Sequence, residues 1–140
     1  MSGAGPRLIL RADAGHRLGS GHVMRLAALA EAAIDAGGAA LLLVGGEPAA
    51  SVAGLRARGL VAVALAPAAT ADDPLAGAAI AAAAAGLAAD AVVVDGPHFA
   101  PAAVDALRDG GRALASLDDR GLAPLPTPIV INPGYGAEAL

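Results

Sequence analysis

Short apolar runs alternate with longer stretches of helical character along the whole chain. This alternation is typical of parallel strands joined by helical crossovers. The runs are continuously apolar, as in strands that helices cover on both faces. The sequence therefore predicts the α/β class, with a Rossmann-like, doubly wound parallel sheet of about six strands. We expect these strands over residues 7–13, 40–46, 61–67, 91–96, 113–119 and 128–134.

Helical periodicity is clearest over residues 22–36, where apolar side chains recur every three to four positions before Gly37 and Gly38 end the pattern. A second helix is expected over 48–58, since proline opens it and Gly59 follows it. The segment 76–89 is nearly all alanine and glycine, which predicts a packing helix without chemistry. The residues expected to face the core from the first helix are Leu26, Leu29, Ala30, Ala33 and Ile34.

The composition limits what this chain can be. Its 140 residues predict one domain, 1–140, and a 56% hydrophobic content with 1% aromatic residues predicts a core of Ala, Val, Leu and Ile. The absence of cysteine excludes disulfides, thiolate metal sites and a cysteine nucleophile. A net charge of −4 argues against a nucleic-acid partner.

Neither a secretory signal nor a membrane span is expected. The first residues lack a basic start and a long apolar run, which predicts a cytoplasmic location. The apolar segment 77–91 is shorter than the roughly 20 residues that cross a bilayer.

Polar residues gather where the predicted strands end. In an open parallel sheet, ligands bind beyond the carboxyl ends of the strands, so these residues are expected on one rim. They are Arg11, Asp13, His16, Gly19, Ser20, Gly21 and His22 after the first strand, Asp95 and His98 after the fourth, Asp118 and Asp119 after the fifth, and Asn132 after the sixth.

The glycine-rich loop 12–22 leads into the start of the first predicted helix. Free N–H groups and the helix dipole favour an anion there, so the loop predicts a phosphate site. Met24 stands where a dinucleotide fingerprint requires its third glycine, and the Lys-Ser/Thr pair of a Walker loop is absent. No NAD or ATP cofactor is therefore expected.

His22 opens this helix, and helical spacing places it beside Arg25 and Leu26 on the inward side, so Arg25 is expected to contact the substrate. Because a helix N-terminus disfavours imidazolium, the ring is expected to be neutral and able to act as a general base. A structural histidine that caps the helix or ties the loop fits the spacing equally well.

Other polar residues have plainer alternatives. A metal site built from His16, His22, His98 and Asp95 is disfavoured, because their spacings match no compact metal motif. Asp95 also suits a helix N-cap, and Asp118 and Asp119 suit a solvated strand end.

Four segments in order resemble a known family. They read ILRADAGHRLGSGHVMRLAALAEA, VVVDGPHF, SLDDRG and VINPGYGAE. Together they resemble the UDP-2,4-diacetamido-2,4,6-trideoxy-β-L-altropyranose hydrolases of pseudaminic acid synthesis and related spore-coat polysaccharide proteins. The resemblance implies a GT-B-like architecture, of which this chain is the first half, and a second nucleotide-binding domain beyond Leu140.

The resemblance also implies an activity and a set of site residues. It implies a UDP-sugar hydrolase that releases UDP, in which His22 activates the attacking water and residues 19–21 line the cleft. Arg11, Asp13 and Asp95 belong to the implied site. His98 stands near the position where the family often carries a tyrosine after the aspartate of the fourth strand.

Two other functions remain open. In a GT-B-type glycosyltransferase for cell-surface polysaccharide, His22 would deprotonate a sugar hydroxyl instead of water. The chain would alternatively be a non-catalytic binding module if it stood alone.

Overall fold

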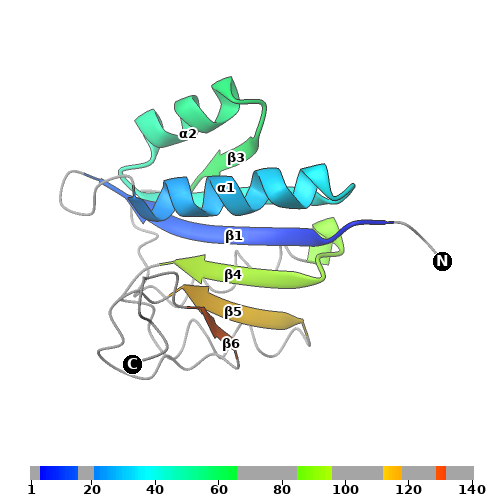
Figure 1. The fold of residues 1–140 in the computed structure, drawn as a ribbon. Coiled ribbons are helices and arrows are strands. Elements are labelled where there is room, and N and C mark those ends of the chain that lie inside the picture. Colours follow the sequence, from blue (N-terminus) through cyan, green and yellow to red (C-terminus); the bar gives the residue numbers. More distant parts are fainter. Residues whose placement is uncertain (1–3, 16–20, 66–84, 96–111, 118–128, 132–140) are drawn as a thin grey trace.

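The computed structural model describes residues 4–15, 21–65, 85–95, 112–117 and 129–131. These residues form one parallel sheet with two helices of nine or more residues packed against it (Figure 1). The α/β, Rossmann-like class predicted from the sequence is confirmed. The described elements are β1 (Arg7–Ala14), α1 (Gly21–Asp35), β2 (Ala39–Gly46), α2 (Ala49–Ala57), β3 (Val61–Ala64), β4 (Ala91–Asp95), β5 (Ala113–Leu117) and β6 (Ile129–Ile131).

The strands lie in the order β3-β2-β1-β4-β5-β6, and every neighbouring pair is parallel. Five of these strands have four or more residues, and the three-residue β6 extends the sheet beyond β5. The chain moves outward from β1 to β3 and then returns to the other side of β1 with β4. This reversal creates a topological switch point between β1 and β4, where sheets of this kind hold their ligands.

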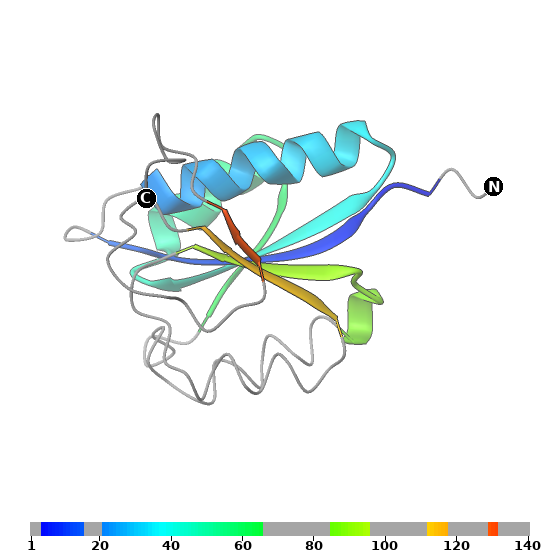
Figure 2. The same ribbon diagram turned by 60° about the horizontal axis from the view of Figure 1, so that its bottom comes forward.

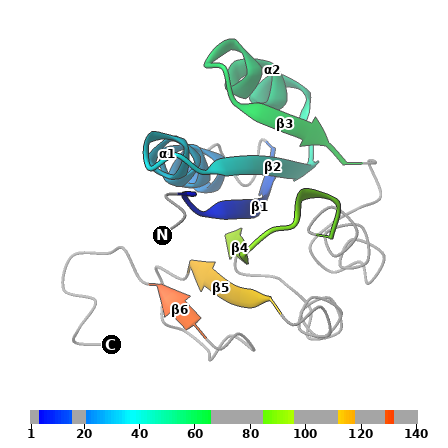
Figure 3. The ribbon, with the colours of Figure 1, turned by 90° about the vertical axis from the view of Figure 1, so that its right-hand side faces the viewer.

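The two helices share one side of the sheet (Figures 2 and 3). Leu10, Ala12 and Val93 face this side together with Leu26 of α1 and Leu55 of α2. The opposite side is also apolar and buried, as the exposures of Ile9 (0%) and Val92 (2%) show. Burial on both faces explains why the strands read as continuous apolar runs.

Helix α1 packs on the sheet through small side chains. Ala27 and Ala30 are fully buried and Ala33 is nearly so, and they follow the larger buried residues Val23 and Leu26 along the helix. Methyl groups allow a helix to approach a sheet closely. The alanine face therefore brings the backbone of α1 near β1 and β2.

The predicted buried face of α1 needs one correction. Ile34 is 43% exposed, and Leu29 is only partly buried, whereas Val23 and Ala27 belong to the core. Periodicity fixes the direction of a side chain around the helix axis, but burial also requires a covering element at that height. Ile34 lies in the last turn of α1, which ends at Asp35.

The predicted element bounds hold within one or two residues for α1, α2, β1, β2 and β4. The predicted helix over 76–89 falls largely on residues that the structure does not describe. Within residues 85–89, Leu87 and Ala89 pack against the sheet face opposite α1.

Candidate functional site

The candidate site lies at the carboxyl end of β4, beside the first turn of α1. Asp95 is the last residue of β4, and its side chain is fully buried. His22 is the second residue of α1, and Arg25 follows one turn later. The i,i+3 spacing places His22 and Arg25 on neighbouring positions of the helix surface. Strand register pairs Asp95 with Ala12, so the site sits at the switch point between β1 and β4.

Four short contacts join these residues. The Nδ1 atom of His22 lies 2.8 Å from Oδ1 of Asp95. The guanidinium of Arg25 donates from Nε to Oδ2 at 2.9 Å and from Nη2 to Oδ1 at 2.6 Å. Nη2 also lies 3.0 Å from Nδ1 of His22. We call His22, Arg25 and Asp95 the rim triad.

The tautomer of His22 follows from its neighbours. A carboxylate only accepts hydrogen bonds, and a guanidinium only donates them. If Asp95 accepts from His22, the proton of the neutral ring is on Nδ1 and the lone pair is on Nε2. The 3.0 Å approach of Nη2 of Arg25 to Nδ1 is then a contact between two donors and not a hydrogen bond. Among the described residues, Nε2 has no hydrogen-bond partner. The imidazole, whose side chain is 21% exposed, can then accept a proton from a ligand at Nε2.

Burial of the Asp95 carboxylate is offset within the triad. An unpaired buried charge costs several kcal/mol, whereas paired oxygens with charged donors largely recover that cost. Arg25 supplies two such donors from a side chain that is 27% exposed. The arrangement is thus a histidine whose ring is oriented by a carboxylate, with an arginine holding that carboxylate.

Arg11 and Asp13 lie on the other face of the sheet. They alternate along β1 with Leu10 and Ala12, which face α1, and share their side with Ile9. Arg11 is fully buried and forms an ion pair with Asp13 at 2.6 Å. It also donates to the carbonyl of Ala12. The side chains of Arg11 and Asp13 therefore point to the other face of the sheet from His22, and their role in a shared site stays a prediction.

The predicted phosphate loop is described only at its ends. Gly21 is exposed at the start of α1, and a Cβ there would meet no atom within 4 Å. The other predicted site residues, Gly19, Ser20, His98, Asp118 and Asn132, lie outside the described residues, as do His16 and Asp119.

No metal cluster gathers in the part of the chain that the structure describes. Within those ranges, no group of three or more His, Asp or Glu side chains lies close enough to hold an ion. The carboxylate of Asp95 faces a guanidinium instead, which is a poor neighbour for a cation.

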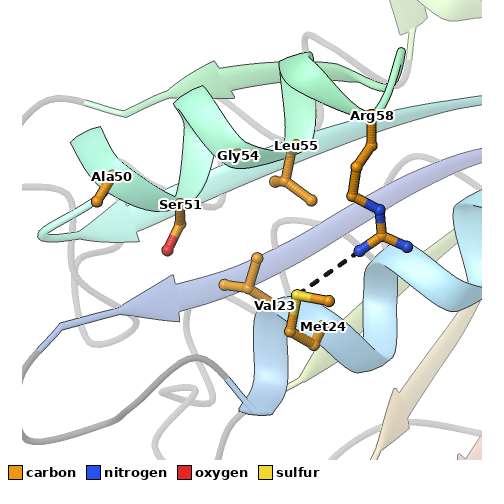
Figure 4. Close-up of a pocket in the computed structure, with 7 residues that line it drawn as sticks. All are labelled: Val23, Met24, Ala50, Ser51, Gly54, Leu55 and Arg58. Atoms are coloured by element: carbon orange, nitrogen blue, oxygen red, sulfur yellow. Dashed lines mark hydrogen bonds between the residues drawn. The ribbon is translucent and has the colours of Figure 1, made fainter.

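A separate hollow of about 310 Å³ lies on the other flank of α1, toward α2 (Figure 4). Val23 and Leu55 form its buried apolar floor, and the exposed Met24 lies beside it. Arg58 reaches across to Met24 and pairs with Glu31. The hollow contains none of the rim triad, so we place the candidate chemistry at Asp95 rather than here.

The sequence names all three triad residues as candidates but does not predict their contacts with one another. The spacing of His22 and Arg25 placed both on one side of the helix. Asp95 was expected at a strand end, with a helix cap as the alternative. The missing information was that the alternation of β4 aims Asp95 toward α1, together with Val93. Residues two positions apart on a strand face the same side of the sheet. The two-residue spacing of Val93 and Asp95 therefore indicates that Asp95 faces the same side as Val93.

Among the described residues, none of the helices is both long and apolar enough to cross a bilayer. In comparisons with known proteins, this chain matches no protein-family model and no curated protein sequence.

Proposed function

We propose that this chain is the first domain of a UDP-sugar hydrolase, with His22 as the general base that activates water. The observation that carries the proposal is the 2.8 Å contact between Nδ1 of His22 and Oδ1 of Asp95 at the switch point of the sheet. An oriented imidazole at this position fits a reaction whose difficult step is proton removal from a weak nucleophile. The proposed whole enzyme includes a second nucleotide-binding domain that completes the cleft.

The proposed step is a hydrolysis. Nε2 of His22 takes one proton from water as the water oxygen bonds to the anomeric carbon of the sugar. The bond between that carbon and the phosphate oxygen breaks, and UDP leaves with its electron pair. Imidazolium then forms beside Asp95, whose carboxylate stabilises it electrostatically.

A histidine that only ties α1 to the sheet would also contact Asp95. Two features favour the base. Arg25 already links α1 to both oxygens of Asp95, so a tie is present without His22. His22 also keeps Nε2 without a partner among the described residues. A purely structural ring gains nothing from that open nitrogen.

The test uses the full-length protein with UDP-sugars, and UDP release is measured with and without an added sugar acceptor. UDP and free sugar without acceptor support the hydrolase, whereas release only with acceptor identifies a glycosyltransferase. Reaction in H₂¹⁸O is expected to place the label in the sugar, because water attacks carbon. Binding without turnover would leave only the binding module.

His22→Ala is expected to lower kcat by roughly 10²–10⁴-fold, the usual range for a positioned general base. The KM is expected to change far less, because the imidazole acts mainly in the transition state. Met24→Ala is the matched control, since Met24 is 47% exposed and lies on the other flank of the same helix turn. Circular dichroism checks that α1 still forms. Normal kcat with weak binding would make His22 a binding residue.

A further inference from the structure

Arg25 has more contact with Asp95 than an ion pair requires. Its Nε and Nη2 atoms donate to different oxygens of the carboxylate, at 2.9 and 2.6 Å. Such a two-pronged arrangement fixes the plane of the carboxylate as well as its position. A lysine ammonium would supply the charge but not this geometry.

The bonds of Arg25 leave a defined place for His22. A carboxylate offers about four acceptor positions on its two oxygens. Arg25 uses both oxygens, and the His22 contact is made at Oδ1, which also accepts from Nη2. The orientation that Arg25 imposes on Asp95 thus sets the direction in which Oδ1 meets Nδ1 of His22.

The backbone allows Arg25 and His22 to contact the same carboxylate. His22 and Arg25 are one helical turn apart, so both side chains reach the same carboxylate from α1. Asp95 belongs to β4, which is paired on both sides, with β1 and with β5. A residue on a central strand provides a firm support for two side chains of a helix.

We propose that Arg25 is a positioning residue: it holds Asp95 in the orientation that keeps His22 in the Nδ1–H tautomer with Nε2 directed outward. The catalytic part of this inference rests on the proposed function. The effect of Arg25 on the tautomer of His22, through Asp95, does not depend on any substrate. It replaces the expectation that Arg25 is a substrate contact, because two of its nitrogens are committed to Asp95.

The first test is spectroscopic and needs no substrate. In ¹⁵N-labelled protein under alkaline conditions, where imidazole rings are neutral, long-range ¹H–¹⁵N spectra report which ring nitrogen carries the proton. The chain has three histidines, so the signal that disappears in His22→Gln is assigned to His22. We expect the Nδ1–H form in the wild type and mixed tautomers in Arg25→Met.

Two further variants make this test decisive. Arg58→Met is the matched control, because Arg58 pairs with Glu31 outside the triad. The His22 signal of this variant is expected to match that of the wild type. If Arg25→Met does not fold, Arg25→Lys keeps the positive charge and removes only the two-pronged contact with Asp95. A wild type without the Nδ1–H form, or a pure Nδ1–H form in the folded Arg25 variants, would overturn the proposal.

The second test is kinetic and uses the full-length protein with a UDP-sugar. Misplaced catalytic groups commonly cost about 10²-fold, so kcat of Arg25→Lys is expected to fall by roughly that factor with little change in KM. A raised KM with normal kcat would identify a substrate contact and reject the positioning role. If the wild type released no UDP, the proposed function would fail, while the spectra would still decide the role of Arg25.

Discussion

Asp95 joins the two sides of the candidate site. Its carboxylate is fully buried at the end of β4, and both oxygens are held by α1 through Arg25. In Asn, one oxygen becomes an NH₂ group that donates rather than accepts. Either Arg25 then faces a donor, or His22 loses its acceptor.

Asp95→Asn is therefore expected to lower kcat steeply, by up to roughly 10⁴-fold, which is the loss that the same change causes in the Asp-His pair of serine proteases. Steady-state UDP release is the measurement. Asp35→Asn serves as the control, because Asp35 is exposed at the end of α1. Equal rates for Asp95→Asn and the wild type would remove the carboxylate from the mechanism.

At this scale the sequence predicts which residues are polar at strand ends, but not which of them meet. The sequence places Arg11, Asp13 and Asp95 alike at one rim of the predicted sheet. Within a strand, the two-residue period tells which residues share a face. Across strands, the shared face depends on the register, and the pairing of Ala12 with Asp95 separates Asp95 from Arg11 and Asp13. Register arises from packing of the whole sheet, which a single sequence does not encode locally.

Among the elements, α1 determines where the site is. Leu26 is 1% exposed and lies between the sheet and the turn that carries His22 and Arg25. Its loss leaves a cavity that backbone movement only partly fills. Leu26→Ala is expected to lower the free energy of unfolding by about 2–5 kcal/mol. Denaturant unfolding measures the change.

Ile34→Ala is the matched comparison on the same helix. Ile34 is 43% exposed, so its truncation is expected to change the free energy of unfolding by no more than about 0.5 kcal/mol. A cost as large as that of Leu26→Ala would mean that another element covers Ile34. Sequence periodicity alone treated the two positions alike, because it carries no information about where the covering layer ends.

Gly46 at the end of β2 has a φ of +72°, and a Cβ there would lie 2.5 Å from the carbonyl oxygen of Ala14. Gly46→Ala is therefore expected to destabilise the fold by more than about 1 kcal/mol. Gly54→Ala on α2 is expected to stabilise it by roughly 0.5–1 kcal/mol, since an added Cβ meets nothing within 4 Å and alanine favours a helix. Thermal unfolding compares both with the wild type, and the same sign for the two variants would contradict this account.

For the molecule as a whole, the row Val61–Leu41–Ile9–Val92 crosses four strands on the face opposite α1. Its outer member, Val61, is 61% exposed, whereas Val92 in the sheet interior is 2% exposed. The alternation of apolar runs predicted the sheet and its class, but it does not tell which strands lie at the edges. Whether a strand lies at the edge or inside the sheet depends on the order of the strands, which places β3 at one edge and β4 between β1 and β5.

A charge at the two ends of this row is expected to have very different costs. Val61→Lys is expected to change the free energy of unfolding by no more than about 0.5 kcal/mol, because the ammonium stays in water. It also places a charge on an edge strand, where lysine disfavours pairing with other chains. Val92→Lys buries an unpaired charge and is expected to prevent folding. Unfolding curves and sedimentation at rising concentration measure both effects, and a large cost at Val61 would show that β3 is covered.

The alanine face of α1 sets the distance between this helix and the sheet at the candidate site. Ala27 and Ala30 are fully buried, so they set the clearance between the helix axis and the sheet. The side chains of Arg25 and His22 have limited length, and they contact Asp95 at distances of 2.6 to 2.9 Å. One added methylene beneath the helix would lift both side chains away from the carboxylate. Positions remote from substrate would then be constrained by catalysis as strictly as the reacting groups themselves.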